Sequence, residues 1–478
     1  MLEGLEIAEI RIGDLERTLR VDAEFYKKTN LIVLSTITAH STSKITELAT
    51  VSDGNHMGIS ENFDADNAIP YYRGQDIHNF YIEQTASAMR IPEAMFETPQ
   101  MRRSHLKNGD VLMSIVGTVG GISLVKTDDK ATCSCKIAII RSKKVIPEFL
   151  ACYLQGFYGQ NQIDKFRRGA VQTGLILEDF DQLLVPNLTE NFQLKIKVLV
   201  DDAFKLIEQS KASYAKAEQT LLEAVGLADF KPSTQNTNIK TFAQSFGTSG
   251  RLDAEYYQPK YDAYIQKIKS YQHGCKSIAE VLTIPIKNGT TPSSVESGYQ
   301  ANEHYFVRVE AFQENLTIDE TLFNSVDSQD YLKYKANITF KNDILVSMTG
   351  TIGAVAIYSP EKPALINQNI MRLRCDTSLI NVESLSIYLK TIGKVLLERV
   401  QTGNVQPYVN TSNFETLIVP IFDAETQTNI SQLVQQSFTL KAQSEHLLNI
   451  AKHAVEMAIE QDEAAAMAWI ATQTKEEK

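Results

Sequence analysis

Two short boxes place acidic side chains beside an arginine, a combination that could support acid–base chemistry. They read RVDAEFY at 20–26 and RLDAEYY at 251–257. Paired carboxylates are common general acids and bases. One hypothesis is therefore an enzyme whose site is assembled from the carboxylates of both boxes, namely Asp22, Glu24, Asp253 and Glu255. The same pattern is also typical of capping and salt bridging at a helix start.

A second pattern is a Gly-Thr-x-Gly turn, which occurs at 117–120 and again at 350–353. Its glycines allow positive φ and close approach of a partner. The turns lack the third glycine, the following helix and the downstream acid of a dinucleotide site, and the chain has no Gly-x-x-x-x-Gly-Lys-Ser/Thr loop. No HExxH, Cys/His cluster, Gly-x-Ser-x-Gly or Asn/Asp-Pro-Pro-Tyr/Phe sequence occurs. We therefore predict no catalytic residue, no metal site and no bound cofactor.

Both patterns belong to a larger internal duplication. The stretch from Asp110 to Val125 returns from Asp343 to Tyr358, so that the numbering shifts by 343 − 110 = 233. Other blocks recur in the same order at nearly the same shift, including Gly-x-Val-Gln at 169–172 and 403–406 and Val-Pro at 185–186 and 419–420. The repeat is too long for a solenoid unit of about 20–50 residues. Two homologous domains are predicted, and residues 20–186 should superpose on residues 251–420.

A long amphipathic helix is predicted after each copy. Apolar or small residues fall mostly at spacings of three and four through 192–225 and again through 430–459, without intervening glycine or proline. Each helix would be about 50 Å long at 1.5 Å per residue, with the narrow apolar seam that suits a coiled coil. The simplest packing is one helix against the other; packing of each helix on its own domain is the alternative. A further helix is expected over 20–40, starting near the first box.

Composition places the chain among ordinary globular proteins. Its 478 residues are 43% hydrophobic and 22% charged, with a net charge of −11. The sequence has no run of about 20 apolar residues, so no membrane span is expected. The acidic N-terminus does not resemble a secretion signal. The five scattered cysteines are expected to be free thiols in a reducing cytoplasm. The acidic balance leaves room for a basic face on an acidic body.

These observations predict an α+β fold with two homologous globular domains and two long helices that pack on each other. The predicted division is a first domain at 1–188, a first spacer helix at 189–230, a linker at 231–250, a second domain at 251–422, and a second spacer helix with tail at 423–478.

The ordered blocks resemble the specificity subunit of type I restriction–modification systems. The resemblance is carried by 251–261, by the Asp-(Ile/Val)-Leu-x-Ser-x-x-Gly-Thr-x-Gly box in both halves, and by Gly-Asn-Val-Gln-Pro at 403–407 before a Val-Pro and a long helix. It covers essentially the whole chain. The first half departs from the pattern after Val-Gln, where Thr173 stands in place of Pro407.

The resemblance implies that the two long helices pair as an antiparallel coiled coil and hold the two domains apart with pseudo-two-fold symmetry. It also implies a non-catalytic, cytoplasmic subunit that reads a split, asymmetric site on double-stranded DNA, with one half-site for each target-recognition domain. It implies recruitment of two methyltransferase subunits, which bind S-adenosylmethionine and methylate adenine, and of motor–nuclease subunits that use ATP with Mg²⁺. The runner-up hypothesis is a two-lobed coiled-coil protein adaptor that never touches DNA, which the acidic charge would suit.

On this hypothesis, cationic side chains would bind phosphates and polar side chains in loops would read base edges. The phosphate candidates are Arg102, Arg103, Lys107, Lys165, Arg167 and Arg168 in the first half, and Lys333, Lys335, Lys394 and Arg399 in the second. The base-reading candidates are Asn55, His56, Arg73, Gln75 and Gln172, followed by Asn288, Thr290, Arg308, Gln401 and Gln406. Thr118 and Thr351 are expected to cap their turns or to contact the DNA backbone.

Overall fold

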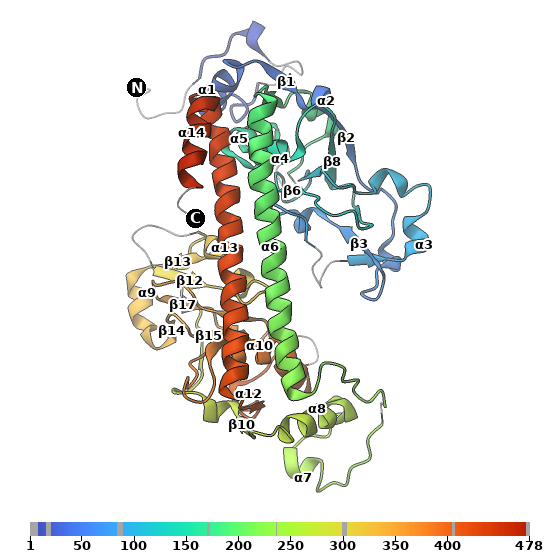
Figure 1. Ribbon diagram of the computed structural model, residues 1–478, viewed down its shortest axis with the longest axis vertical. Coiled ribbons are helices and arrows are strands. Elements are labelled where there is room, and N and C mark those ends of the chain that lie inside the picture. Colours follow the sequence, from blue (N-terminus) through green and yellow to red (C-terminus); the bar gives the residue numbers. More distant parts are fainter. Residues whose placement is uncertain are drawn as a thin grey trace. The chain divides into compact units, whose positions relative to one another are not determined.

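The computed structural model (Figure 1) describes residues 8–15, 21–83, 89–169, 173–235, 237–298, 304–403 and 407–474. The chain forms two compact units. Unit 1 combines Met1–Leu206 with Gln443–Lys478, and unit 2 is Ile207–Ala442. The division into five parts that we made from the sequence stays a prediction.

Unit 1 is built on a four-stranded antiparallel sheet in the order β2-β8-β5-β6, beside a three-stranded sheet in the order β4-β3-β7. Strands β5 and β8 are apolar and buried along most of their length, because both faces of this sheet are covered. The strands are β1 (Thr42–Lys44), β2 (Ala49–Asp53), β3 (Ile69–Tyr72), β4 (Met89–Ile91), β5 (Asp110–Ser114), β6 (Ile122–Leu124), β7 (Thr132–Cys133), β8 (Ile137–Ser142) and β9 (Leu184–Pro186); the helices are α1 (Lys28–Thr38), α2 (Ile45–Leu48), α3 (Glu93–Phe96), α4 (Pro147–Gln155) and α5 (Phe157–Phe166).

Unit 2 has the corresponding sheets, in the orders β11-β18-β15-β16 and β13-β12-β17-β14. The strands are β10 (Cys275–Ser277), β11 (Lys287–Asn288), β12 (His304–Val307), β13 (Asn324–Val326), β14 (Ile338–Thr339), β15 (Ile344–Ser347), β16 (Val355–Ile357), β17 (Ala364–Ile366), β18 (Ile370–Leu373) and β19 (Ile418–Pro420). The helices are α7 (Phe246–Ser249), α8 (Pro259–Lys269), α9 (Ser328–Lys333), α10 (Val382–Tyr388), the π-helical η11 (Leu389–Gly393), α11 (Lys394–Val400) and α12 (Thr411–Glu415).

Strand pairing repeats between the two units. Strand β3 pairs in parallel with β7, as β12 does with β17, and β1 pairs antiparallel with β9, as β10 does with β19. The two predicted strands that flank each Gly-Thr-x-Gly turn are present as the antiparallel pairs β5–β6 and β15–β16. The α+β fold and its duplication, which we predicted from the sequence, are confirmed.

A buried carboxylate begins the strand–turn–strand segment of each unit and pairs with a half-exposed arginine of the neighbouring strand or its end. Asp110 is 1% exposed and accepts two hydrogen bonds of 2.7 Å from the guanidinium of Arg141 on β8. In unit 2, Asp343 accepts bonds of 2.6 and 2.9 Å from Arg374. Each carboxylate also accepts a backbone N–H at 2.8 Å, from Lys107 or from Phe340. These bonds raise the pKa of both arginines above its ordinary value and stabilise the start of the box strand.

The two long helices are α6 (Glu190–Val225) and α13 (Ala424–Glu460), and they pack together (Figure 1). Within unit 2, the Ser210 hydroxyl donates to the Ser437 carbonyl at 2.7 Å and the Ser213 hydroxyl donates to the Leu433 carbonyl at 3.0 Å. Residue numbers rise on one helix as they fall on the other, so the pairing is antiparallel. Small serines in the seam let the two backbones approach closely.

The repeat also relates the serine contacts. Ser444 is the repeat equivalent of Ser210 (444 − 210 = 234), and its hydroxyl donates to the Ala203 carbonyl at 2.7 Å within unit 1. The apolar seam predicted over 430–459 lies within α13, which begins at Ala424, one residue after the predicted start of the second spacer segment at 423. The tail forms a separate helix, α14 (Glu463–Gln473), which begins after Asp462 because its side chain caps the Ala465 amide at 2.8 Å.

The helix expected over 20–40 is shorter than predicted. The described part of the first box, 21–26, precedes the helix as a turn, and α1 begins only at Lys28. The Asp22 carboxylate accepts the backbone N–H of Phe25 at 3.0 Å, which closes this turn. The five cysteines are free thiols. None of the described helices has both the length and the apolar character needed to cross a membrane.

We expect the Asp110→Asn substitution to destabilise unit 1 by about 1–2 kcal/mol, because the buried carboxylate loses charge-assisted bonds to a guanidinium that is 39% exposed and partly screened by water. Asp343→Asn should have a similar effect on unit 2. Equilibrium urea unfolding followed by circular dichroism measures the change. Asp128→Asn, at an exposed position of unit 1, is the control and should be neutral. Equal stability of the Asp110 and Asp128 variants would contradict a role for the ion pair.

Candidate nucleic-acid interface

The Gly-Thr-x-Gly turn has an open tip in both units. Gly117 and Gly350 have φ of +83° and +70°, and an added Cβ at either position would meet nothing within 4 Å. Glycine is therefore needed for the backbone conformation and not for lack of space. The box serine holds the turn: Ser114 Oγ accepts the Gly121 amide at 2.9 Å, and Ser347 Oγ donates to the Thr349 carbonyl at 2.9 Å.

A second loop folds against each turn as a narrow hairpin. In unit 1, Arg168 and Gly174 exchange backbone hydrogen bonds of 3.0 and 2.9 Å, and the Gly117 amide donates to the Thr173 carbonyl at 3.0 Å. In unit 2, Thr402 and Tyr408 exchange bonds of 2.9 and 2.8 Å. Turn and hairpin together form one loop surface in each unit. The predicted base-reading residues Gln172 and Gln406 fall outside the described residues.

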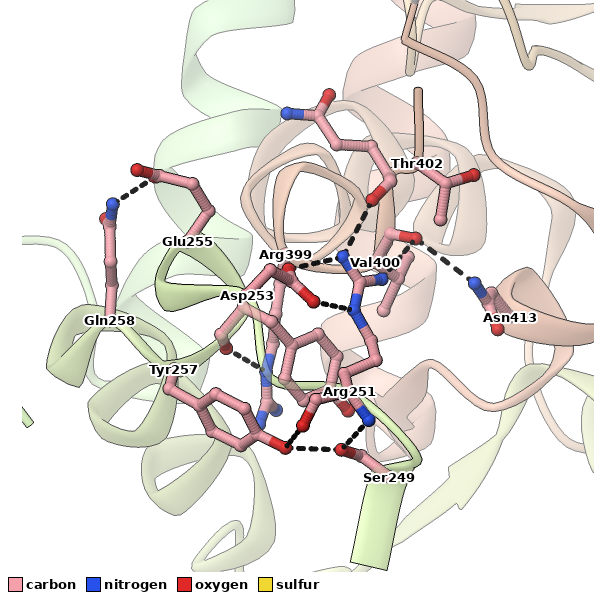
Figure 2. A network of polar contacts seen from close by, with 12 residues as sticks. Ser249, Arg251, Asp253, Glu255, Tyr257, Gln258, Arg399, Val400, Thr402 and Asn413 are labelled. Atoms are coloured by element: carbon pink, nitrogen blue, oxygen red, sulfur yellow. Dashed lines mark hydrogen bonds and ion pairs between the residues drawn. The ribbon is translucent and has the colours of Figure 1, made fainter. Parts of the chain in front are cut away.

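The segment 251–257 contacts the end of α11, from which the hairpin of unit 2 starts (Figure 2). The Arg251 guanidinium donates to both carboxylate oxygens of Asp253 at 2.7 and 2.6 Å, and to the carbonyls of Val400 and Gln401 at 3.3 and 3.1 Å. These carbonyls lie at the C-terminal end of α11, where helix carbonyls lack internal partners. The Asp253 bond raises the pKa of Arg251, and the same bond lowers the pKa of Asp253.

An aromatic ring of each box lies beneath a cation of the helix that leads into the hairpin. In unit 2 the guanidinium of Arg399 lies 4.4 Å from the Tyr256 ring centroid, and that of Arg251 lies 4.7 Å from it. In unit 1 the ammonium of Lys165 lies 4.2 Å from the Phe25 ring. Cation–π contacts of this kind are worth about 0.5–2 kcal/mol. The segments 20–26 and 251–257 therefore position α5 and α11, the helices that precede the hairpins. Their aspartates accept hydrogen bonds within the same segment.

Several predicted phosphate-binding cations are engaged within the protein. Arg168 forms a bidentate pair with the buried Asp179 at 2.8 and 2.6 Å. Arg399 also donates to the Tyr256 carbonyl at 3.1 Å, Arg167 donates to the Val119 carbonyl of the turn at 2.7 Å, and Arg103 pairs with Asp53. These guanidinium groups stabilise the turns and hairpins of their own unit. Their roles toward DNA stay predictions.

Other predicted cations are exposed. Four of them are exposed, and among the described residues their side chains have no recorded hydrogen bond or ion pair: Arg102, Lys107, Lys335 and Lys394. Lys333 is exposed as well, with its ammonium 4.7 Å from the Tyr334 ring. Arg102 and Lys335 are equivalent in the repeat (335 − 102 = 233), and each begins a short 3-10 turn, η4 (Arg102–Ser104) or η10 (Lys335–Asn337).

Among the base-reading candidates, Asn55 is 3% exposed and its amide donates to the Met57 carbonyl at 3.1 Å, so it stabilises its own loop. His56 is exposed and lies 2.6 Å from the Asp53 carboxylate. The side-chain oxygen of Asn288 accepts the Thr411 hydroxyl at 3.1 Å.

Thr290 pairs through its backbone, donating to the Ile366 carbonyl at 2.9 Å. Gln401 accepts a hydrogen bond of the Arg251 guanidinium through its carbonyl. Gln75 is exposed at the surface of unit 1. Whether any of these side chains reads a base stays a prediction.

Two predicted residues of unit 1, Arg73 and Gln75, line one cavity with the turn. Their loop is tied to the turn because the Thr118 hydroxyl donates to the Gly74 carbonyl at 3.1 Å, so Thr118 bonds within the protein. The cavity is lined by Met57, Ile59, Ser60, Phe63, Tyr71, Arg73, Gly74, Gln75, Met89, Val116, Gly117, Thr118, Ser134 and Lys136. Lys136 and the apolar side chains that line this cavity, such as Ile59 and Phe63, were not predicted from the sequence. A lysine directly before the buried strand β8 was the available signal.

A comparison with known families matches part of the chain. The family model described as "Type I restriction modification DNA specificity domain" matches residues 274–450. The matched range contains most of unit 2. It also contains residues 443–450 of α13, which belong to unit 1. Residues 274–450 are therefore similar to this DNA specificity domain. This family is a non-catalytic DNA-recognition component of type I systems, so the match favours DNA recognition over the enzyme hypothesis built on the carboxylates at 20–26 and 251–257.

Solved structures of specificity chains are similar at low identity. The S subunit from M. genitalium is 14% identical, with 88% of this chain and 95% of that chain covered and a TM-score of 0.40. The HsdS subunit from Thermoanaerobacter tengcongensis is 15% identical, with 88% and 97% covered and a TM-score of 0.27. A chain from a study of type I complex assembly and conformational transition is 15% identical, with 88% and 98% covered and a TM-score of 0.30. The similarity to the specificity family rests on the match of residues 274–450.

We expect Arg251→Lys to loosen the hairpin of unit 2, because an ammonium cannot reproduce the planar fork that bonds Asp253 and two carbonyls. Amide hydrogen exchange at Thr402 and Tyr408 should accelerate about tenfold, which corresponds to the loss of one or two hydrogen bonds. Exchange at Arg168 and Gly174 in the hairpin of unit 1 provides the internal control and should not change. Unaltered exchange at Thr402 and Tyr408 would show that the box does not stabilise the hairpin.

Proposed function

We propose that this specificity chain reads a bipartite, asymmetric site on double-stranded DNA, with the loop surface of each unit contacting one half-site. The observation that carries the proposal is the repetition of one constellation, a Gly-Thr-x-Gly turn with a hairpin folded against it, in both units of a chain whose second half matches a DNA specificity domain. Phosphate contacts would supply affinity and loop side chains would supply specificity.

The proposal extends to partners. The chain would recruit two methyltransferase subunits that bind S-adenosylmethionine and motor–nuclease subunits that use ATP with Mg²⁺, while binding no cofactor itself. Its place would be the cytoplasm, where the DNA and these subunits are. Among the described residues there is no group of three or more His, Cys, Asp or Glu that could hold a metal ion.

The decisive experiment is methylome sequencing of cells that express the chain with its cognate methyltransferase subunit. We expect adenine methylation at one split motif with an unread gap, and no methylation from either subunit expressed alone. The purified chain should bind duplex DNA with modest affinity that falls steeply with salt, because phosphate contacts release counterions. Binding of S-adenosylmethionine by the isolated chain, or methylation without a partner, would contradict the division of labour.

A helix insertion tests whether the paired helices set the gap between the half-sites. Four residues added after Glu208 lengthen α6 by about 6 Å and rotate the remainder of the helix by about 40° beyond a full turn. That length approaches two base-pair steps of about 3.4 Å. Methylome sequencing should show both half-sites unchanged and the gap longer by one or two base pairs.

The same insertion separates the rival hypothesis. A protein adaptor that never touches DNA predicts no link between helix length and any DNA property. A fully active insertion variant with an unchanged gap would rule out the helices as a ruler. A changed half-site would show that the reading residues do not lie on the loop surfaces.

A further inference from the structure

Arg73 of unit 1 and Arg308 of unit 2 occupy equivalent places in the repeat, where the numbering shifts by 308 − 73 = 235. Each directly follows the strand that pairs in parallel, β3 or β12, and precedes a short 3-10 turn. Their backbone angles agree, with φ −115° and ψ 166° at Arg73 and φ −115° and ψ 167° at Arg308. The two side chains therefore leave the backbone in the same way.

Neither guanidinium is fully used inside the protein. The side chains are 31% and 41% exposed, and in both residues the Nε atom is buried without a hydrogen-bond partner. The nearest carboxylates stand 3.6 Å away, at Asp76, and 3.8 Å away, at Glu310, which is beyond ordinary hydrogen-bond length. Arg308 also lies 5.8 Å from the Phe306 ring, near the outer limit of a cation–π contact.

The acidic neighbours do not explain why the arginine is present in both copies. With the same shift in numbering, Asp76 corresponds to Ala311, and Glu310 corresponds to Gln75. The acid therefore occupies a different position in each unit while the arginine stays in place. A side chain whose only task was this ion pair would have a matching partner in both units.

In unit 1 the arginine lines the same cavity as the open turn. Arg73 shares this cavity with Gly117 and Thr118, and the space above Gly117 is empty to 4 Å. A planar guanidinium beside an unobstructed glycine turn suits a phosphate group, which arginine binds through two parallel N–H donors. In an acidic chain such contacts need locally placed cations.

We propose that Arg73 and Arg308 are equivalent phosphate contacts, one in each unit, and not the base readers that their loop position first indicated. The inference rests on the proposed function. Two half-sites of an asymmetric DNA site differ in sequence and share only the phosphodiester backbone. A residue repeated with the same geometry in both units therefore contacts what the half-sites have in common.

Base reading then falls to positions where the units differ. Gln75 faces solvent in unit 1, where unit 2 has Glu310. Lys136 corresponds to Asn369, and the carbonyl of each accepts the same backbone bond at 2.9 Å, from Ile115 or from Met348. Equivalent backbone with unlike side chains is what two related domains with different target sequences require.

The test measures binding of the full chain to a random-sequence duplex by fluorescence anisotropy over a series of salt concentrations. Arg73→Gln and Arg308→Gln should each weaken binding about tenfold and lower the slope of log K against log salt by about one. The double variant should lower the slope by about two, since the sites are independent. Arg73→Lys should keep the parent slope and lose only part of the affinity. Lys216→Gln, which removes an exposed charge from α6, is the matched control and should change neither value.

A second readout separates phosphate contact from base reading. In cells with the methyltransferase subunit, the methylome of each glutamine variant should retain the full parent motif at lower occupancy. Relaxed specificity at one base pair of one half-site would overturn the proposal in favour of base reading. A lower melting temperature with an unchanged salt slope would overturn it in favour of a structural role. Failure of the parent chain to bind any DNA would overturn the proposed function itself, whereas parental binding with unaltered variants would overturn only the arginine assignment.

Discussion

The pair between a buried carboxylate and a half-exposed guanidinium, at the start of each strand–turn–strand segment, is the interaction on which the rest of each unit depends. Asp110 with Arg141, and Asp343 with Arg374, join the box strand to its neighbour in the four-stranded sheet. Because each carboxylate also accepts a backbone amide from the preceding turn, it positions the strand's first residue. The Gly-Thr-x-Gly turn at the other end of that strand inherits this position. The proposed DNA contact by this loop surface would need such a rigid base.

The cations near the loops divide into two groups by their partners. Lys165, Arg168 and Arg399 lie against aromatic rings or a buried carboxylate, where they hold the hairpin helices. Arg73 and Arg308 lie at equivalent positions of the repeat, have carboxylates only at 3.6 and 3.8 Å, and keep a buried Nε atom without a hydrogen-bond partner. Both groups look alike in the sequence, since each is a positive charge in or near a loop. Only the partner atoms distinguish a cation that builds the loop from one that is available to a ligand.

The serines of the helix seam extend the same logic of repetition to α6 and α13. Ser210 and Ser444 are equivalent in the repeat, and each donates to a carbonyl of the facing helix at 2.7 Å. A polar side chain in a coiled-coil seam can specify register at some cost in stability. Because the bond is directional, a shift of one helix along the other would leave the hydroxyl without its acceptor.

The sequence by itself determined the duplication, the α+β class, the strand–turn–strand boxes and both long helices. These features depend on local periodicity and on repeated residue types, which need no knowledge of distant contacts. The sequence also placed a helix start too early in the first box, because a capping turn and a helix N-terminus use the same residues.

Tertiary structure alone decided which side chains are available. The bidentate pair of Arg168 with Asp179, the buried amide of Asn55 and the cavity beneath Arg73 join residues from separate strands and loops. Spacing along the chain cannot report such contacts, since a hydrogen bond depends on position to within a few tenths of an ångström. The sequence could therefore indicate which loops form the candidate interface. The role of each side chain in those loops depends on the contacts that form on folding.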